Sequence, residues 1–252
     1  MKMIHPKWCA PSVVRAAMTT RLGGVSVAPY DALNLGYATA DDRASVMQNE
    51  RLTAAELGVL EANIRWVYQV HGVDVHHAES LPQNAPLGST EIKGDAVVSH
   101  RAGLVCAVKV ADCMPVLFAA RDGSAVGAAH AGWRGLSGGA LERTVAALHV
   151  APEQLVCWLG PCIGPTAFEV GEEVRAAFVA HDPLAAQHFV QRATPGKFLC
   201  DMYSIARQRL HAIGITDVSG GEYCTFNQPD LFFSHRRQLI TGRMAAFVWI
   251  DP

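Results

Sequence analysis

The sequence predicts a fold of the α+β class, in which strands and helices are mixed along the chain. A near-continuous apolar run in its middle, over residues 104–110, indicates a strand that is covered on both faces. After residue 137 the apolar residues recur with a helical period, and the chain ends on another apolar run. Because helices and strands do not alternate strictly, an α+β or mixed α/β arrangement is favoured over a regular barrel.

The expected strands are short and follow one another closely. The first alternates and is rich in β-formers, and the second is a near-continuous apolar run. The next two are separated by Arg121–Asp122–Gly123–Ser124, which is a good turn sequence. The expected strands span residues 64–68, 104–110, 115–120, 125–129, 156–159 and 244–250.

Three segments have the spacing of helices. Residues 138–149 are expected to follow an N-cap at Ser137, and residues 202–213 an N-cap at Asp201. The third expected helix spans 170–180. Residues 81–94 hold Pro, Gly, Asn and Ser close together and are predicted as a loop, too short to divide domains. With no internal repeat, we expect a single domain over residues 1–252.

Composition excludes several classes of function. The 252 residues carry a formal net charge of −2 with no basic run, so neither nucleic acid nor an anionic membrane is an expected partner. No apolar stretch reaches the roughly 18 residues of a membrane helix, and the N-terminus lacks the apolar region of a signal peptide. A cytoplasmic location is therefore expected. The seven cysteines are odd in number and widely spaced, so disulfides are not expected.

Three segments place a metal-capable side chain beside glycine or proline at the end of a predicted strand. They are Gln69–Val70–His71–Gly72, Ala111–Asp112–Cys113–Met114–Pro115 and His130–Ala131–Gly132. Two imidazoles and one thiolate are a ligand set that zinc accepts, and three protein ligands leave a position open for water or substrate. Such an ion would lower the pKa of bound water.

Spacing alone leaves a structural interpretation open. His71 and Cys113 are 42 residues apart, and Cys113 and His130 are 17 apart, with no local motif such as CxxC. A lone histidine is often a satisfied structural residue, and a free thiol often a small buried hydrophobe. Asp95, which opens a predicted strand, fits either a structural role or a role behind a metal ligand.

Several arginines are candidates for binding an anion or a planar base. Arg134 stands among glycines that precede a predicted helix, where backbone N–H groups can converge. Arg21 is flanked by glycines, and Arg236 and Arg237 follow an aromatic pair. A solvated arginine at a strand-to-helix turn, or a charged rim around an apolar core, explains the same patterns.

These segments, in their order, resemble the YfiH-type family. The resemblance rests on QVHG, ADCMP, HAGWRG, GPCIGP followed by FEVG, DMYSIAR, and FFSHRR followed by TGRMA, and runs from about residue 19 to the C-terminus. Members have been labelled polyphenol oxidases or laccase-domain proteins, and later purine nucleoside phosphorylases. The resemblance implies a layered α/β/β/α domain with mixed sheets, similar to a toxin deamidase fold.

The resemblance also implies chemistry. It implies catalytic zinc, with copper possible, held by His71, Cys113 and His130. It implies phosphorolysis of adenosine, inosine and methylthioadenosine to the free base and ribose 1-phosphate, together with deamination of adenosine. We expect the anion at Arg134 and Arg21. Further contacts to the nucleoside are expected from Asn34, Gln69, His235 and Arg236. Val110 stands where threonine is common, and His235 stands where tyrosine is common. If that tyrosine contacts substrate in the family, we expect a different specificity in this chain.

Three other functions remain to be weighed. A copper-dependent polyphenol oxidase needs several copper centres, yet the eleven histidines include no His-x-His pair. A cysteine hydrolase or amidase acting on peptidoglycan precursors would use Cys113 as nucleophile and His130 or His71 as base. A non-enzymatic binding protein is the third. The expected partners are purine nucleosides and phosphate, and the sequence does not set the oligomeric state.

Overall fold

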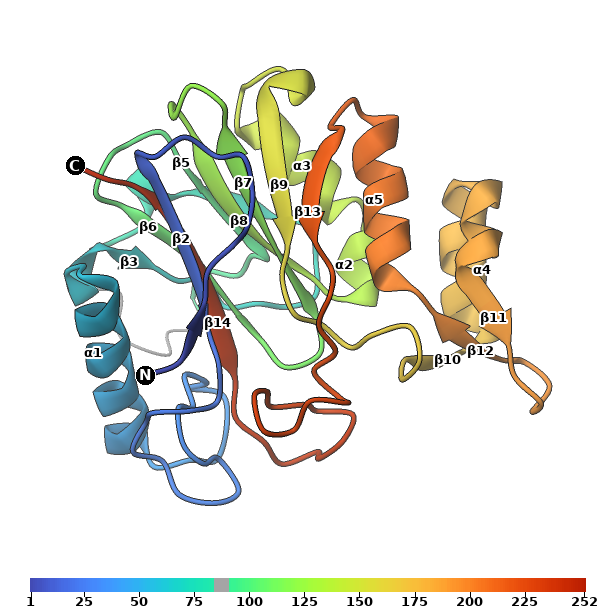
Figure 1. The fold of residues 1–252 in the computed structure, drawn as a ribbon, viewed down its shortest axis with the longest axis horizontal. Coiled ribbons are helices and arrows are strands. Elements are labelled where there is room, and N and C mark those ends of the chain that lie inside the picture. The colour runs from blue at the N-terminus through green and yellow to red at the C-terminus, as the bar shows by residue number, and fades with distance from the viewer. Residues whose placement is uncertain (84–90) are drawn as a thin grey trace.

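A computed structural model describes residues 1–83 and 91–252 and shows two sheets stacked face to face, with helices on both outer faces (Figure 1). This confirms the layered α/β/β/α arrangement with mixed sheets. One sheet has five strands in the order β1-β2-β14-β6-β3. Its strands are β1 (Met3–Ile4), β2 (Val14–Thr19), β14 (Met244–Ile250), β6 (Val105–Val110) and β3 (Ile64–Arg65).

The second sheet has six strands in the order β13-β9-β7-β8-β5-β4. The pairs β7–β8 and β7–β9 are antiparallel, whereas β13–β9 and β4–β5 are parallel. Its strands are β13 (Asp217–Gly220), β9 (Leu155–Leu159), β7 (Met114–Ala120), β8 (Val126–Ala131), β5 (Ala96–Ser99) and β4 (Val75–His77).

The continuous apolar runs of the central strands fill two cores at once. In β7, Leu117 points into the core between the sheets, while Val116 and Phe118 point to the helices on the other face. In β14, Val248 enters the same inter-sheet core and Phe247 faces the opposite way. Because side chains alternate across a strand, a strand covered on both faces must be apolar at nearly every position.

The helices close the two outer faces. Helix α1 (Arg43–Leu57) covers the five-stranded sheet, and α2 (Trp133–Gly138), α3 (Ala140–Ala147) and α5 (Met202–Ala212) cover the six-stranded sheet. Short 3₁₀ turns complete the connections. They are η1 (Glu61–Asn63), η2 (Ala78–Ser80), η3 (Pro152–Gln154) and η4 (Pro183–His188).

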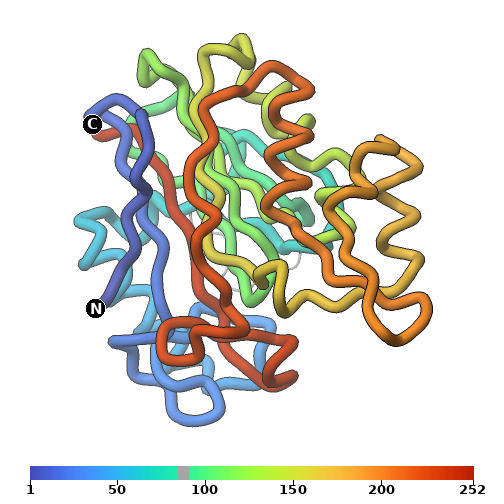
Figure 2. The backbone as a smooth tube through the Cα atoms, turned by 45° about the vertical axis from the view of Figure 1, so that its right-hand side comes forward, coloured from blue at the N-terminus to red at the C-terminus, as the bar shows by residue number. Residues whose placement is uncertain are grey.

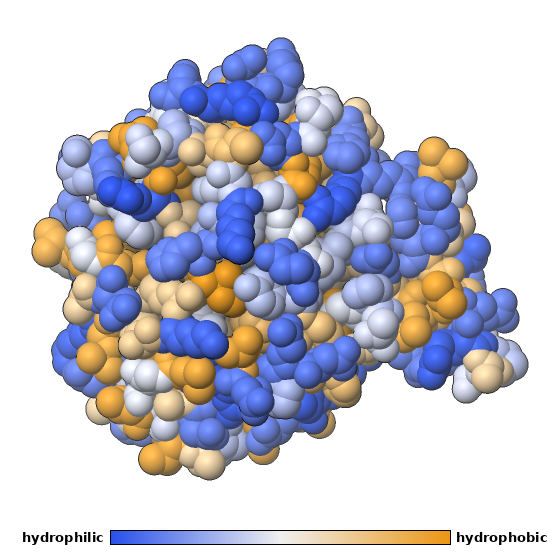
Figure 3. Space-filling model, in the orientation of Figure 1, coloured by the Kyte–Doolittle hydropathy of each residue, from blue (hydrophilic) through white to orange (hydrophobic). Residues whose placement is uncertain are grey.

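A small lobe stands out from the main body beside α5 (Figure 2). It consists of helix α4 (Glu172–His181) and a sheet of β10 (Glu169–Gly171), β12 (Lys197–Cys200) and β11 (Phe189–Gln191). The face of the molecule in Figure 3 mixes hydrophilic and hydrophobic residues over both the body and the lobe. No helix of the described residues is long and apolar enough to span a bilayer.

Most of the predicted elements are present, although several differ from the prediction in their bounds. The strand expected over 64–68 is limited to Ile64–Arg65, and Tyr68 makes only an isolated bridge to Lys93. The predicted helix 170–180 begins instead at Glu172, because residues 169–171 pair with β12. The predicted loop over 81–94 lies partly outside the described residues, which omit 84–90.

The helix expected over 138–149 is two helices divided by Gly139. The φ angle of Gly139 is 97°, a left-handed conformation that favours glycine and ends α2. Ser137 is therefore not an N-cap but lies inside α2, where its hydroxyl donates to the carbonyl of Arg134 at 3.1 Å. The N-cap predicted at Asp201 is confirmed, since its carboxylate accepts from the backbone N–H of Ser204 at 3.1 Å.

Candidate metal centre

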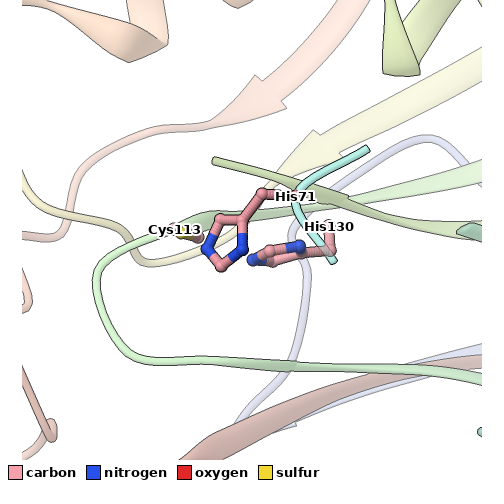
Figure 4. A group of neighbouring side chains, drawn as sticks. All are labelled: His71, Cys113 and His130. Carbon is pink, nitrogen blue, oxygen red and sulfur yellow. The ribbon is translucent and has the colours of Figure 1, made fainter. Parts of the chain in front are cut away.

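His71, Cys113 and His130 come together at one end of the inner strands, although they are remote in sequence. Cys113 directly precedes β7, and His130 lies in β8 opposite Pro115 of β7. His71 lies in the connection between β3 and β4 with a φ angle of 60°. One ligand atom from each residue lies within 4.8 Å of the others, and the three side chains face one another in Figure 4.

Asp95 organises this group from behind. Its Oδ1 accepts hydrogen bonds from Nδ1 of His130 at 2.8 Å and from the backbone N–H of His71 at 2.9 Å. Its Oδ2 accepts from the N–H of Gly72 at 2.7 Å. A carboxylate that receives the Nδ1 proton of a histidine leaves Nε2 as the metal ligand and fixes the orientation of the ring. The role of Asp95 behind a ligand is thus the one that the geometry supports.

Cys113 and His130 shift each other's pKa in directions that favour a thiolate, which is the form of cysteine that binds a metal cation. Burial alone would raise the pKa of Cys113, but the charges and hydrogen bonds of His130 and His71 outweigh burial and lower it to about 6. Burial alone would lower the pKa of His130, but the Cys113 charge and the Asp95 hydrogen bond raise it to about 9. Asp95 is buried, yet its hydrogen bonds from His130 and the backbone lower its pKa. Both shifts favour a thiolate beside an imidazolium in the metal-free protein.

The donor set and the space around it fit a zinc ion. A thiolate and two imidazoles are ligands that zinc binds, and the Asp95 bond to His130 is the support such ligands usually have. Gly132 keeps the space open, because a Cβ there would lie 2.9 Å from Sγ of Cys113 and 3.0 Å from Cδ2 of His71. We expect His71, Cys113 and His130 to hold the ion.

The metal group lies in the wall of a cavity of about 750 Å³. Of the residues predicted to contact substrate, Gln69, Arg134, His235 and Arg236 line this cavity. The side-chain amide of Gln69 is already hydrogen-bonded within the protein. Its Nε2 donates to the carbonyl of Lys109, and its Oε1 accepts from the N–H of Lys109, each at 2.7 Å. The Gln69 side chain thus pairs with the backbone of β6 in the way that a neighbouring strand does. The structure thus brings four predicted residues to the cavity, one of them already hydrogen-bonded.

Arg21 and Asn34 do not line the cavity. Nε of Arg21 donates to the carbonyl of Asp31 at 2.9 Å, and its guanidinium stacks over the ring of Phe233 at 4.7 Å. Asn34 is fully buried, and its side-chain oxygen accepts from the backbone N–H groups of Gly36 and Arg243, each at 2.9 Å. Both residues stabilise the loop between β2 and α1, so the geometry gives no support to the substrate contacts expected of them.

Three cations in the cavity wall, Arg65, Lys109 and Arg243, were missed by the sequence analysis. Lys109 projects from β6 toward Glu50 of α1 at 3.5 Å and lies over the rings of Tyr37 and Trp66. A lysine inside an apolar strand was the available signal. Arg243 directly precedes β14, and its signal was the Thr-Gly-Arg sequence at the start of a predicted strand. Strand ends are where functional side chains gather on a rigid scaffold.

We expect the metal-free protein to show an unusually acidic Cys113. In protein stripped of metal, the rate of alkylation of Cys113 by iodoacetamide should rise with a midpoint near pH 6, because the neighbouring imidazoles stabilise the thiolate. An ordinary thiol would show a midpoint near about 8.5. The site of alkylation is read by peptide mass spectrometry, and zinc added at pH 7 should protect it. An ordinary midpoint, or no protection, would mean that the three side chains do not act together.

Comparison with known proteins identifies the family of this chain. The family model described as multi-copper polyphenol oxidoreductase laccase matches residues 15–251. A purine nucleoside phosphorylase of Pseudomonas aeruginosa is 49% identical over 248 residues, covering 98% of each chain. The purine nucleoside phosphorylase YfiH of Escherichia coli is 48% identical over 250 residues, covering 99% of each chain.

Solved structures show the same fold. A protein of Neisseria meningitidis matches with a TM-score of 0.92 and 42% identity over 100% of both chains. The YlmD protein of Geobacillus stearothermophilus matches with a TM-score of 0.89 and 32% identity, covering 96% of this chain and 93% of that one. The chain therefore belongs to the family whose model is named multi-copper polyphenol oxidoreductase laccase, and within it to the YfiH-type proteins named purine nucleoside phosphorylases.

Proposed function

We propose that this chain is a zinc-dependent purine nucleoside phosphorylase. The observation that carries the proposal is the convergence of His71, Cys113 and His130, backed by Asp95, in the wall of a large cavity. Relatives that are 40–49% identical over nearly the whole chain are named purine nucleoside phosphorylases, which supports an enzyme of that kind.

The lining of the cavity suits both substrates of such a reaction. A purine has flat faces that stack on aromatic rings, and Trp66, Tyr68, Trp133 and Phe168 supply them. Phosphate needs cationic donors. The cavity volume lies within the range of about 300–1,000 Å³ that holds drug-sized ligands. The cations in its wall are Arg65, Lys109, Arg134, Arg236 and Arg243.

The residues of the site have separate roles in this proposal. When bound, a zinc ion supplies a Lewis acid at the cavity wall. Cys113 and the two histidines would hold that charge in place, and Asp95 keeps the Nδ1 proton of His130, so that its Nε2 lone pair stays available. The aromatic lining excludes water from the sugar and base and orients them. Arg134 lies over the ring of Trp133 at 4.3 Å, which places a cation beside the proposed base site.

The proposed substrates are inosine, adenosine and methylthioadenosine, with adenosine also deaminated. The test uses purified protein of known metal content with each nucleoside, with and without phosphate. We expect free base and ribose 1-phosphate in equimolar amounts, with turnover lost after chelation and recovered with zinc. Inosine formed from adenosine would reveal deamination. Release of no base from any nucleoside by zinc-loaded protein would contradict the proposal.

The alternatives are less well supported. Among the described residues, one group of three metal-capable side chains converges, whereas multicopper oxidation needs several copper centres. Copper in this one site is decided by metal analysis of protein purified without added metal. A cysteine hydrolase would use the same Cys113 and His130, but the names of the relatives do not favour it. Activity that survives complete removal of metal would revive it.

A further inference from the structure

Arg243 lines the cavity at the same end of the five-stranded sheet as the metal group. It directly precedes Met244, the first residue of β14, and Met244 pairs with Val110, the last residue of β6. The chain runs from Val110 through two residues to the metal ligand Cys113. The register of the five-stranded sheet therefore places Arg243 at the same end as the metal group, and both line one cavity.

The backbone and side chain of Arg243 are held from several sides. Its backbone N–H donates to Oδ1 of Asn34 at 2.9 Å, and its Nη1 donates to the carbonyls of Thr241 at 2.9 Å and Gly242 at 3.0 Å. Gly36 lies against its stem, since a Cβ on Gly36 would be 2.7 Å from Cγ of Arg243. These contacts use one nitrogen of the guanidinium and leave donors on the others for a ligand.

The positive charge of Arg243 has no carboxylate partner. Within the described ranges, no carboxylate oxygen lies within 4.0 Å of its guanidinium nitrogens. Burial lowers its pKa, while the charges of Cys113 and Asp112 act to raise it. Asp112 is already used, because its two oxygens accept from Thr225 at 2.6 Å and from the N–H of Arg236 at 2.7 Å. A partly buried guanidinium in this position is stabilised by a mobile anion.

The other cations of the cavity wall are engaged differently. Arg65 donates from two of its nitrogens, to the carbonyl of Ala78 at 3.2 Å and to that of Ala62 at 2.5 Å. Lys109 is paired with Glu50 at 3.5 Å. Nη1 of Arg236 donates to the carbonyl of Glu169 at 2.8 Å, and its guanidinium lies over Phe168. Arg134 lies over Trp133. Arg243 combines a fixed stem, free donors and proximity to the charge of Cys113.

We infer that Arg243, supported by Asn34 and Gly36, forms the binding subsite for the phosphate co-substrate beside the metal group. This inference rests on the proposed phosphorolysis. A guanidinium can donate two parallel N–H bonds to two phosphate oxygens, leaving a third oxygen to react. That oxygen forms the bond to C1′ of the ribose as the C1′–N9 bond breaks. The bonding electron pair leaves with N9, and the proton of hydrogen phosphate ends on the purine.

Asn34 has a role in this subsite that differs from the substrate contact expected of it. It does not contact substrate but acts through Arg243, so it is a positioning residue. Its Oδ1 joins the N–H groups of Gly36 and Arg243, and its Nδ2 donates to Thr39 and Asp41, each at 2.9 Å. The loop between β2 and α1 is thereby tied to the start of β14.

The test measures the binding of inorganic phosphate to zinc-loaded protein by calorimetry, together with the two Michaelis constants. In Arg243→Gln, we expect the dissociation constant and KM for phosphate to rise at least about tenfold, because charge-assisted donors are lost. The KM for inosine and the zinc content should stay within about twofold, and Arg243→Lys should recover part of the affinity. Arg121→Gln is the matched control, because Arg121 follows the other end of β7 and pairs with Asp217 there.

Gly36→Ala approaches the same subsite without touching the charge. The added methyl group should displace the stem of Arg243 and weaken phosphate binding in the same direction, with zinc retained. It also serves as the test if Arg243→Gln fails to fold. Unchanged phosphate affinity in both variants, or no phosphate binding to the wild-type protein, would overturn the subsite. Phosphate binding that depends on Arg243 in a protein that cleaves no nucleoside would instead leave the subsite standing and remove the proposed function.

Discussion

Replacing Cys113 by alanine should remove both the bound zinc and the phosphorolysis of inosine. The thiolate is the one anionic ligand of the group, and without it two imidazoles must hold a divalent ion alone. Loss of a Lewis acid that contributes several kcal/mol to the transition state corresponds to a fall in kcat/KM on the order of a thousandfold. Metal is measured by mass spectrometry of the purified protein, and turnover by release of hypoxanthine.

The control for this variant is Cys9→Ala, which removes an exposed thiol elsewhere on the molecule. It should keep one zinc per chain and full activity. Thermal unfolding of both variants, compared with metal-stripped wild-type protein, separates loss of the ion from loss of the fold. A Cys113→Ala protein that phosphorolyses inosine at the normal rate would contradict the assignment of the site.

Replacing Asp95 by asparagine should weaken zinc binding and destabilise the fold together. The carboxylate accepts from His130 and from the N–H groups of His71 and Gly72, and an amide NH₂ would point a donor at one or more of these donors. Loss of the partner behind a metal-bound histidine typically costs 10- to 100-fold in affinity or activity. Buried donors left without an acceptor cost about 1–3 kcal/mol each.

The measurements for Asp95→Asn are the zinc dissociation constant, from competition with a chromogenic chelator, and the free energy of unfolding in urea. Asp122→Asn is the matched control, because Asp122 is an exposed turn residue that accepts from Ser124. We expect about 3 kcal/mol of destabilisation in the first variant, as the sum of such orphaned donors, and a change below about 0.5 kcal/mol in the second. Normal zinc affinity in Asp95→Asn would show that Asp95 does not organise the ligands.

Local patterns predicted the elements that are governed by local physics. The continuous apolar run of β6 indicated a strand covered on both faces, and its side chains do enter two separate cores. Asp201 was correctly identified as an N-cap from its position alone. Gly139 divided a predicted helix because periodicity does not report a left-handed residue within an otherwise helical pattern.

The site was predicted in part because its ligands stand in distinctive segments, while the surrounding contacts depend on strand register. The order of the motifs indicated His71, Cys113 and His130, and the three side chains converge; their role as metal ligands stays a prediction. Arg21 looked like a candidate for binding an anion, but the loop between β2 and α1 folds its side chain onto Asp31. Arg243 reaches the cavity only because β14 is inserted between β2 and β6. The spacing of neighbouring residues does not predict which strands pair when those strands are more than 100 residues apart in the chain, as β14 and β6 are.

The most direct test of the metal assignment is X-ray absorption at the zinc edge on the purified, active protein. We expect one sulfur at about 2.3 Å and two imidazole nitrogens at about 2.0–2.1 Å, with one zinc per chain. Cys113→Ala should hold no zinc and give no spectrum at the zinc edge, whereas Cys9→Ala should keep the sulfur signal. A coordination shell without sulfur, or full activity in protein that contains no metal, would contradict the proposal that this thiolate and these two imidazoles form the catalytic centre.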